Sequence, residues 1–290
     1  MNEQKAVRMR TFFTSKKVSD SLYIIWESYC DTQSLTLGLA VGSERAVLID
    51  CGLGAVDGLR KYAESLTDKP VFCIATHGHP DHAGAAGLFE FIYMNEKDIP
   101  EIRWGLTRER RLSDLQDFSN HNEEVQRYAE THCVDNTEVR FKSIQTGDIF
   151  DLGGVQLEIL EIPGHTKGSV AVINREEKYI FSGDAVSRTL MVTGYERSCM
   201  EESYAALKRL VDIGETMLPN LTLYAAHYPQ PVPLQMAADL RDACHEVLLG
   251  ERDADERTHF KFAEMNDPDI VLYKHCSHDV EVTYNAAAFR

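Results

Sequence analysis

The sequence predicts a mixed α/β fold in which two separate runs of strands are accompanied by helices. Strand-like segments occur in two groups, at 22–26, 35–41, 46–50 and 71–75, and again at 139–144, 155–162, 169–173 and 179–181. Apolar residues recur at helical spacing in three other segments, at 56–66, 204–213 and 234–249. Strands and helices in this order favour a layered α/β architecture.

The first group opens as an antiparallel meander. Polar residues separate segment 22–26 from 35–41, and Gly42-Ser43-Glu44 separates 35–41 from 46–50, so we expect neighbouring strands joined by turns. The next residues, Val56, Leu59, Tyr62 and Leu66, form one apolar stripe of a helix. A buried strand at 71–75 follows this helix.

Residues 95–137 are charged and favour helices, and we interpret them as a helical insertion. Apolar residues lie at helical spacing in two parts of this stretch, at Leu112, Leu115 and Phe118, and at Val125, Tyr128 and His132. The insertion also contains Trp104. It could cover a pocket or form a dimer face, although such a stripe most often packs against a core.

Residues 230–290 are expected to be a C-terminal extension of a single domain spanning 1–290. Pro229 and Pro231 break the chain after a strand at 221–226 and before the helix at 234–249. The charged run at 251–257 has the composition of a solvated segment, and 271–273 could pair with 280–284 as a terminal hairpin.

Composition excludes several classes of function. The 290 residues include 30 Lys plus Arg and 46 Asp plus Glu, giving a formal net charge of −16, so no nucleic-acid partner is expected. The apolar runs are much shorter than the roughly 20 residues of a membrane-spanning helix, and residues 1–14 lack a signal-peptide core. The seven cysteines include no Cys-x-x-Cys pair, which is typical of reduced thiols. We expect a soluble cytoplasmic protein without a membrane partner.

The most informative motif is Thr76-His77-Gly78-His79-Pro80-Asp81-His82, directly after a predicted buried strand. Three imidazoles and a carboxylate at a strand end can face one crevice, and these groups suit Zn²⁺ and related ions. Side chains one or two residues apart in a turn diverge in direction. The motif therefore favours two adjacent metal ions that share further ligands from elsewhere in the chain.

Three other strand ends offer those ligands. They are Pro163-Gly164-His165-Thr166, Ser182-Gly183-Asp184-Ala185 and Ala225-Ala226-His227-Tyr228-Pro229. A single histidine after a strand is more often structural, but the shared placement of these three segments favours a common site.

With these motifs in order, the chain resembles the metallo-β-lactamase superfamily, over about residues 22–229. The resemblance implies a four-layer αββα sandwich, here with a helical insertion and a C-terminal extension. It also implies that His77, His79 and His165 bind a first metal, that Asp81, His82 and His227 bind a second, and that Asp184 bridges both. By the same resemblance, Asp50 orients the metal cluster through hydrogen bonds.

This resemblance implies a dinuclear metal-dependent hydrolase of a small ester, thioester or lactone. Two divalent ions, zinc first with iron or manganese as alternatives, would lower the pKa of a shared water toward 7. We expect Asp81, Asp184 and Asp50 to be the carboxylates on which catalysis depends. The chain has no Gly-x-Ser-x-Gly or Gly-x-x-x-x-Gly-Lys-Ser/Thr motif, and Gly52-Leu53-Gly54 lacks the third glycine of a dinucleotide-binding turn.

Branches of the superfamily differ from this chain in several positions. True β-lactamases carry cysteine where Asp184 stands, and the diiron flavoproteins usually carry an acid where His79 stands. Lactonase-like members often have a tyrosine shortly after the bridging aspartate, whereas Val186, Ser187 and Arg188 follow it here. The remaining likeness is to glyoxalase II-like and lactonase-like hydrolases.

Three alternative functions remain open from the sequence. One is a phosphodiesterase for small substrates, and another is a mononuclear iron persulfide dioxygenase using a subset of ligands around His77, His79 and Asp184. The third is a non-catalytic metal-binding module. Candidates to contact an anionic substrate are Lys167, Arg188 and Tyr195. The His275-x-x-His278 pair with Cys276 has the residue types of a further metal site, but no partner motif accompanies it. A homo-oligomer is the alternative to a monomer.

Overall fold

The computed structural model describes residues 12–192, 196–260, 263 and 267–289. Its first sheet has seven strands in the spatial order β1-β2-β3-β4-β5-β6-β7. They are β1 (Phe13–Lys17), β2 (Leu22–Glu27), β3 (Leu35–Val41), β4 (Ala46–Ile49), β5 (Val71–Ile74), β6 (Ile92–Met94) and β7 (Phe141–Ser143). Strands β1 to β4 pair antiparallel, and β2 to β4 are the predicted meander. Strands β4 to β7 pair parallel, so segment 139–144, which was grouped with the later strands, belongs to this first sheet because β7 pairs with β6.

The second sheet has five strands in the order β13-β11-β10-β9-β8. They are β8 (Ile149–Asp151), β9 (Gln156–Glu161), β10 (Val170–Asn174), β11 (Tyr179–Phe181) and β13 (Thr222–Tyr224). The two sheets face each other across a buried apolar layer in which Ile24, Val47 and Ile49 of the first meet Ile159 and Val172 of the second. This packing is the middle of the predicted sandwich.

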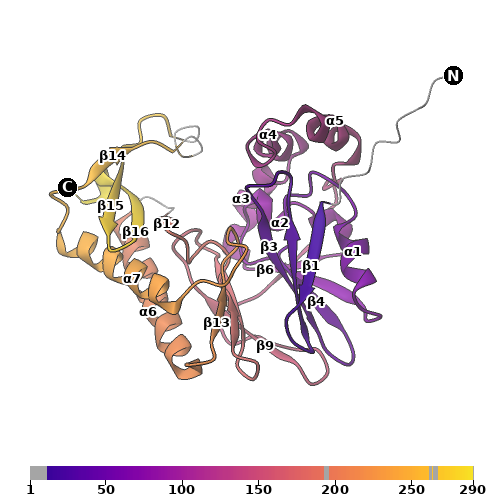
Figure 1. Ribbon diagram of the computed structural model, residues 1–290. Coiled ribbons are helices and arrows are strands. Elements are labelled where there is room, and N and C mark those ends of the chain that lie inside the picture. The colour runs from indigo at the N-terminus through magenta and orange to yellow at the C-terminus, as the bar shows by residue number, and fades with distance from the viewer. Residues whose placement is uncertain (1–11, 193–195, 261–262, 264–266, 290) are drawn as a thin grey trace.

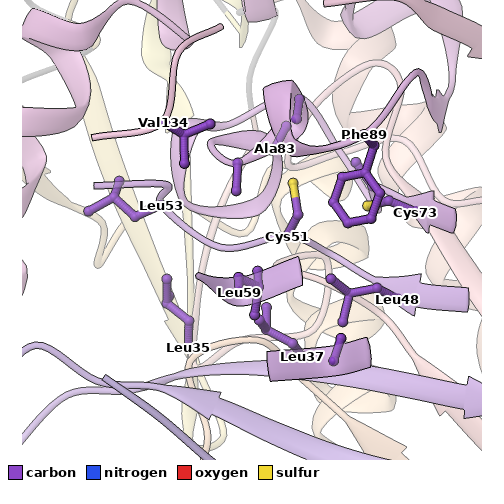
Figure 2. Packing of buried hydrophobic residues seen from close by; sticks show 14 of the residues in the cluster. Leu35, Leu37, Leu48, Cys51, Leu53, Leu59, Cys73, Ala83, Phe89 and Val134 are labelled. Atoms are coloured by element: carbon purple, nitrogen blue, oxygen red, sulfur yellow. The ribbon is translucent and has the colours of Figure 1, made fainter. Parts of the chain in front are cut away.

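Helices cover the other face of the first sheet. They are α1 (Leu59–Ser65), α2 (Pro80–Ala83), α3 (Ile99–Gly105), α4 (Arg108–Phe118) and α5 (Glu123–His132), with short 3₁₀ turns η1 (Ala86–Leu88) and η2 (Glu96–Asp98). Figure 2 shows Leu37 and Leu48 of the sheet facing Leu59 of α1, with Phe89 and Val134 in the same cluster. The predicted insertion at 95–137 therefore contains three α-helices. Its two apolar stripes, represented by Leu115 of α4 and Val125 of α5, pack on this core.

The outer face of the second sheet is covered by α6 (Arg197–Met217) and α7 (Leu234–Leu249). Their buried faces, including Leu207, Leu210 and Leu240, pack against Ile173 and Ile180 of the sheet. The molecule thus consists of a helical layer, two sheets and a second helical layer, with a buried apolar cluster between each neighbouring pair. This is the predicted four-layer sandwich. The prediction of a helix at 204–213 was too short, because the small buried residues Cys199 and Ser203 extend the stripe without an obvious apolar signal.

A third sheet lies beyond α7, in the order β12-β16-β15-β14. Its strands are β12 (Thr189–Met191), β14 (Glu256–Thr258), β15 (Leu272–Ser277) and β16 (Val280–Asn285), followed by the 3₁₀ turn η3 (Ala286–Phe289). The predicted terminal hairpin is confirmed as β15 and β16. Strand β12 pairs parallel with β16, so the chain just after Asp184 shares a sheet with the C-terminal extension. No helix in the described ranges combines the length and apolarity needed to cross a bilayer.

A buried histidine joins this third sheet to α7. The His275 ring places Nδ1 2.7 Å from an Asp255 oxygen and Nε2 2.9 Å from a Glu246 oxygen, and the Tyr284 hydroxyl donates to the other Asp255 oxygen. Burial disfavours the charged ring, but the hydrogen bonds to the two carboxylates outweigh burial and raise the pKa of His275. The structure gives no support to a metal site at His275 and His278, which the sequence analysis had raised, because both ring nitrogens of His275 are engaged by carboxylates.

We expect His275→Ala to lower the free energy of unfolding by about 3 kcal/mol near neutral pH or below, because it leaves two carboxylates without their cation. The folded-state pKa of His275 lies above its unfolded value, so this stabilisation is complete below about pH 6.5 and is lost as the pH rises through the folded-state pKa. Urea unfolding of both proteins from pH 6 to pH 10 measures the difference. A difference that stays constant or grows with pH contradicts the assignment.

Candidate metal centre

The histidine motif occupies the turn between β5 and α2, at the edge where the parallel strands end. His79 has extended backbone dihedrals at the N-cap of α2, and Pro80 begins the helix. Asp81 and His82 therefore lie in the first helical turn, whereas His77 and His79 precede it. This change of backbone direction sends neighbouring side chains of the motif to two sides of one crevice.

The structure brings all the predicted ligands together in two groups. The three-histidine group contains His77, His79 and His165, and the mixed group contains Asp81, His82, Asp184 and His227. Within each group, one potential ligand atom of every residue lies within 4.8 Å of those of the others. In the first group, His79 Nδ1 is 3.1 Å from His77 Nε2 and 2.8 Å from His165 Nε2.

Asp184 lies between the two groups. Its Oδ2 is 3.5 Å from His165 Nε2 of the three-histidine group and 3.2 Å from His227 Nε2 of the mixed group, while its Oδ1 is 3.4 Å from His82 Nε2. Gly183 allows this approach, because a Cβ there would lie 2.4 Å from Thr76 Oγ1 and its φ is +53°. Asp184 therefore lies within reach of potential ligand atoms from both groups.

Asp50 contacts both ends of the histidine motif. It accepts hydrogen bonds from the backbone N–H of Thr76 at 2.6 Å and from the Thr76 hydroxyl at 3.0 Å. His82 Nδ1 lies 2.8 Å from Asp50 Oδ2, which leaves His82 Nε2 facing the site. Asp50 has a φ of 62°, a left-handed conformation that aspartate tolerates better than most residues. The predicted orienting role of Asp50 is consistent with these contacts.

Two buried atoms indicate that the donors fit a cation. His82 Nε2 and Asp184 Oδ1 are both buried and lack a hydrogen-bond partner. An unsatisfied buried polar atom is costly and needs an explanation. An imidazole nitrogen and a carboxylate oxygen that converge in this way match the donor types that divalent metals bind.

The electrostatics differ between the groups. Burial and the neighbouring histidines hold the pKa of His77 well below its usual range, and burial likewise lowers the pKa of His79 and, to about 4, that of His165. These rings are therefore neutral at pH 7, the form that binds a metal.

In the mixed group, two carboxylates are paired with two histidine rings whose pKa values they raise. Asp184 raises the pKa of His227 to about 10, and although burial lowers the pKa of His82, the charges of Asp184, Asp50 and Asp81 raise it overall. Burial opposes ionisation of Asp81 and Asp184, but the neighbouring histidines hold the pKa of each carboxyl below its usual range. Both carboxylates are thus ionised at pH 7, and a divalent cation would replace the protons of these two rings.

Asp98, which the sequence analysis did not identify, ties the two ligand loops of the three-histidine group together. Its carboxylate accepts from Gly78 N at 2.9 Å, from the Thr166 hydroxyl at 2.7 Å and from Gly168 N at 2.6 Å. Asp98 is fully buried at the end of η2. A Cβ at residue 168 would meet the Asp98 carboxyl carbon at 2.6 Å, so the contact also requires glycine there.

Thr36, also missed, holds the loop that carries His227. Its backbone N–H donates to the Ala226 carbonyl and its hydroxyl to the Tyr228 carbonyl, both at 2.7 Å. The Tyr228 hydroxyl accepts a hydrogen bond from Arg188 N, which joins this loop to the segment after Asp184. In the sequence, Thr36 has no signal beyond its place in an apolar strand.

The helical insertion is anchored directly at the site. Arg111 of α4 is 1% exposed, and its guanidinium donates to the carbonyls of Gly54, Gly84 and Val134. Gly54 follows the Asp50 loop and Gly84 follows the histidine motif, so one buried side chain connects the insertion to both. Of the predicted anion contacts, Lys167 and Arg188 are exposed, and Tyr195 lies outside the described residues.

Comparison with known proteins shows the family to which the chain belongs. The family model described as the metallo-beta-lactamase superfamily matches residues 36–219, a span that includes every predicted ligand except His227. The chain is 26% identical over 217 residues to the acyl-coenzyme A thioesterase MBLAC2 of Homo sapiens, covering 70% of this chain and 76% of that protein. It is 32% identical over 143 residues to the hydroxyacylglutathione hydrolase GloC of Haemophilus influenzae, covering 49% and 62%.

Solved structures share the fold at low sequence identity. The metallo-beta-lactamase family protein TTHA1429 from Thermus thermophilus is 21% identical, with a TM-score of 0.57 over 87% of this chain and 89% of that one. The metallo-beta-lactamase from Pontibacter korlensis is 18% identical, with a TM-score of 0.54 over 80% of this chain and 99% of that one. These similarities support the architecture of the sandwich.

We expect Asp98→Asn to weaken binding of one metal ion by about 10–100-fold, because the amide cannot accept from all three donors that now hold the ligand loops. Titration of the apo-protein with zinc against a chromophoric chelator measures each affinity, and circular dichroism checks the fold. Glu96→Gln, at an exposed position of the same turn, is the matched control. Equal zinc affinities in both variants would show that Asp98 does not position the ligands.

Proposed function

Because the chain belongs to the metallo-β-lactamase superfamily, whose members matched above include hydrolases, we propose that it is a dinuclear metal-dependent hydrolase of a small thioester. The observation that carries the proposal is the position of Asp184, whose Oδ2 is within 3.5 Å of a nitrogen from each ligand group. A single ion would not need a carboxylate shared by two separate donor sets.

In this proposal His77, His79 and His165 hold one ion, Asp81, His82 and His227 hold the other, and Asp184 bridges them. When bound, two such ions supply an ionised water at neutral pH and polarise a carbonyl oxygen. Zinc suits the imidazole-rich donors, and iron and manganese are the alternatives that metal analysis distinguishes.

The protein's own residues orient these groups. Asp50 fixes the ring of His82 through Nδ1, which leaves Nε2 facing the mixed group and able to serve as a ligand there. Asp81 is 15% exposed in its side chain and lies with its Oδ2 3.3 Å from His227 Nε2, at the open side of the site. The two carboxylates Asp81 and Asp184 offset part of the charge of the ions, whereas the three-histidine group contributes none.

Two considerations favour a thioester over the other substrates. Two of the relatives reported above are named as a thioesterase of acyl-coenzyme A and a hydrolase of hydroxyacylglutathione, and both names describe cleavage of a bond between an acyl group and sulfur. The tyrosine that lactonase-like members often carry shortly after the bridging aspartate is replaced here by Val186, Ser187 and Arg188. We further place the protein in a reducing compartment such as the cytoplasm, since Cys51, Cys73, Cys199 and Cys244 are buried thiols.

We expect the purified protein to contain about two divalent ions per chain and to hydrolyse thioesters, with activity lost on chelation and restored by zinc. Metal analysis combined with thioester, lactone, phosphodiester and persulfide substrates measures this. One iron per chain with oxygen consumption on persulfide would identify a dioxygenase instead. Metal-loaded protein inactive on the whole panel would overturn the proposal in favour of a binding module.

We expect Asp184→Asn to weaken at least one metal by about 10–100-fold and to abolish turnover without unfolding the chain, because the amide cannot bridge two cations with negative charge. Metal stoichiometry, thioester hydrolysis and thermal unfolding are measured together. Asp212→Asn, which removes an exposed carboxylate paired with Lys208 on α6, is the control and keeps both metals. Full activity in Asp184→Asn would refute the bridging role.

A further inference from the structure

The loop that follows β4 lies against the end of α2 through backbone atoms. The N–H of Cys51 donates to the His82 carbonyl at 2.7 Å, and the N–H of Gly84 donates to the Gly52 carbonyl at 2.8 Å. Figure 2 shows Cys51 of the loop and Ala83 of α2 in the same packed cluster. We call this contact the backbone clamp.

The clamp requires glycine on both of its sides. A Cβ at Gly54 would lie 2.1 Å from the Gly84 carbonyl oxygen, and a Cβ at Gly84 would lie 2.1 Å from the Leu53 carbonyl oxygen. The backbones of the two segments are thus as close as they can come, and a shift of one segment displaces the other. The position of α2 therefore depends on the position of the loop.

Arg111 of α4 closes the clamp. Its Nη1 donates to the carbonyls of both segments, to Gly54 at 2.7 Å and to Gly84 at 3.1 Å. Its Nη2 donates to the Val134 carbonyl at 2.7 Å, and its Nε donates to the Leu106 carbonyl at 3.2 Å. A guanidinium can hold several carbonyls at once because its five N–H donors point in fixed directions, whereas the ammonium of lysine is a single compact charge.

The clamp lies next to the mixed ligand group. Two of the four members of that group, Asp81 and His82, lie in α2, and Gly84 is the C-cap of this helix. The ligand loops of the three-histidine group are joined by a different side chain, Asp98. The two groups of candidate ligands thus have separate supports.

The far end of α4 contacts the mixed group as well. Phe118, the last residue of this helix, places its ring parallel to that of His227, with an interplanar angle of 15° and a centroid separation of 6.2 Å. Arg111 and Phe118 are about two helical turns apart. One helix therefore reaches α2 through its arginine and His227 through its phenylalanine.

We propose that Arg111 is a positioning residue for the second ion. By closing the backbone clamp it fixes α2, and this gives the mixed group its affinity for metal, while the three-histidine group binds its ion without Arg111. Helix α4 thus determines whether the centre holds one ion or two. This inference rests on the dinuclear site of the proposed function and deepens it by naming a residue that controls one half of the site.

The zinc affinity of each group is measured in a background that lacks the other. His77→Ala/His165→Ala retains the mixed group, and Asp81→Ala/His227→Ala retains the three-histidine group. Competition with a chromophoric chelator gives each affinity. We expect Arg111→Lys to lower zinc affinity by about tenfold or more in the first background and by less than about twofold in the second, because lysine cannot bind both clamp carbonyls and the two outer carbonyls together.

Arg108→Lys is the matched control for this substitution. Arg108 lies on the same helix, is exposed and donates to the Glu130 carbonyl, so its replacement leaves both zinc affinities unchanged. Thermal unfolding of the metal-free proteins is recorded alongside. If Arg111 only stabilises the chain, Arg111→Lys lowers Tm and affects the two backgrounds equally.

Gly54→Ala opens the clamp without changing Arg111. Its methyl group displaces the Gly84 carbonyl, so we expect the same selective loss of zinc affinity in the background that retains the mixed group. Gly147→Ala is the matched control, because Gly147 also has a positive φ, +93°, but an added Cβ there meets no atom within 4 Å.

The outcomes separate this inference from the function on which it rests. Wild type that binds fewer than two zinc ions contradicts the proposed dinuclear site. Wild type that binds two, with Arg111→Lys either without effect or equally harmful to both groups, contradicts the positioning role of Arg111 while the dinuclear site stands. Loss of the fold in both Arg111→Lys and Gly54→Ala also contradicts it, because the clamp then supports the whole chain rather than one group.

Discussion

The buried carboxylate of Asp50 is the contact around which the candidate centre is organised. It holds Thr76 at the start of the histidine motif and His82 at its end, so the geometry of the whole turn depends on one side chain at the end of β4. Asp98 plays a similar part in the three-histidine group, where its carboxylate joins the loop of His79 to that of His165. The lone pairs of the candidate ligand atoms repel one another where they converge. The hydrogen bonds of Asp50 and Asp98 hold the ligand side chains in place against this repulsion.

Much of this centre could be predicted from the sequence because its signals are local. The histidine motif spans seven residues, and His165, Asp184 and His227 each follow a recognisable strand. The supports could not be predicted in this way. Thr36 and Tyr228 are 192 residues apart, and Asp98 and Thr166 are 68 apart, so only the folded chain shows that they meet.

The fold was predictable to a similar degree and for a similar reason. Buried strands such as β3 and β10 have continuous apolar runs, whereas β1 is a mostly polar edge strand, Phe-Thr-Ser-Lys-Lys, that alternation does not reveal. The sequence predicted that the insertion is helical, but it did not predict which of its residues lie beside the site. Its contribution of one buried arginine and one aromatic ring to the neighbourhood of the site depends on tertiary packing alone.

The parallel pairing of β12 with β16 affects the order in which the molecule can be completed during synthesis. The segment after Asp184 ends in β12, and its partner strand β16 follows much later in the chain. Until β16 has been synthesised, β12 has an unpaired edge and the segment after Asp184 lacks this contact. The contact spans about ninety positions, a separation of the kind that slows folding. In the nascent chain, the segment after Asp184 therefore gains its strand partner only long after the histidine motif has been synthesised.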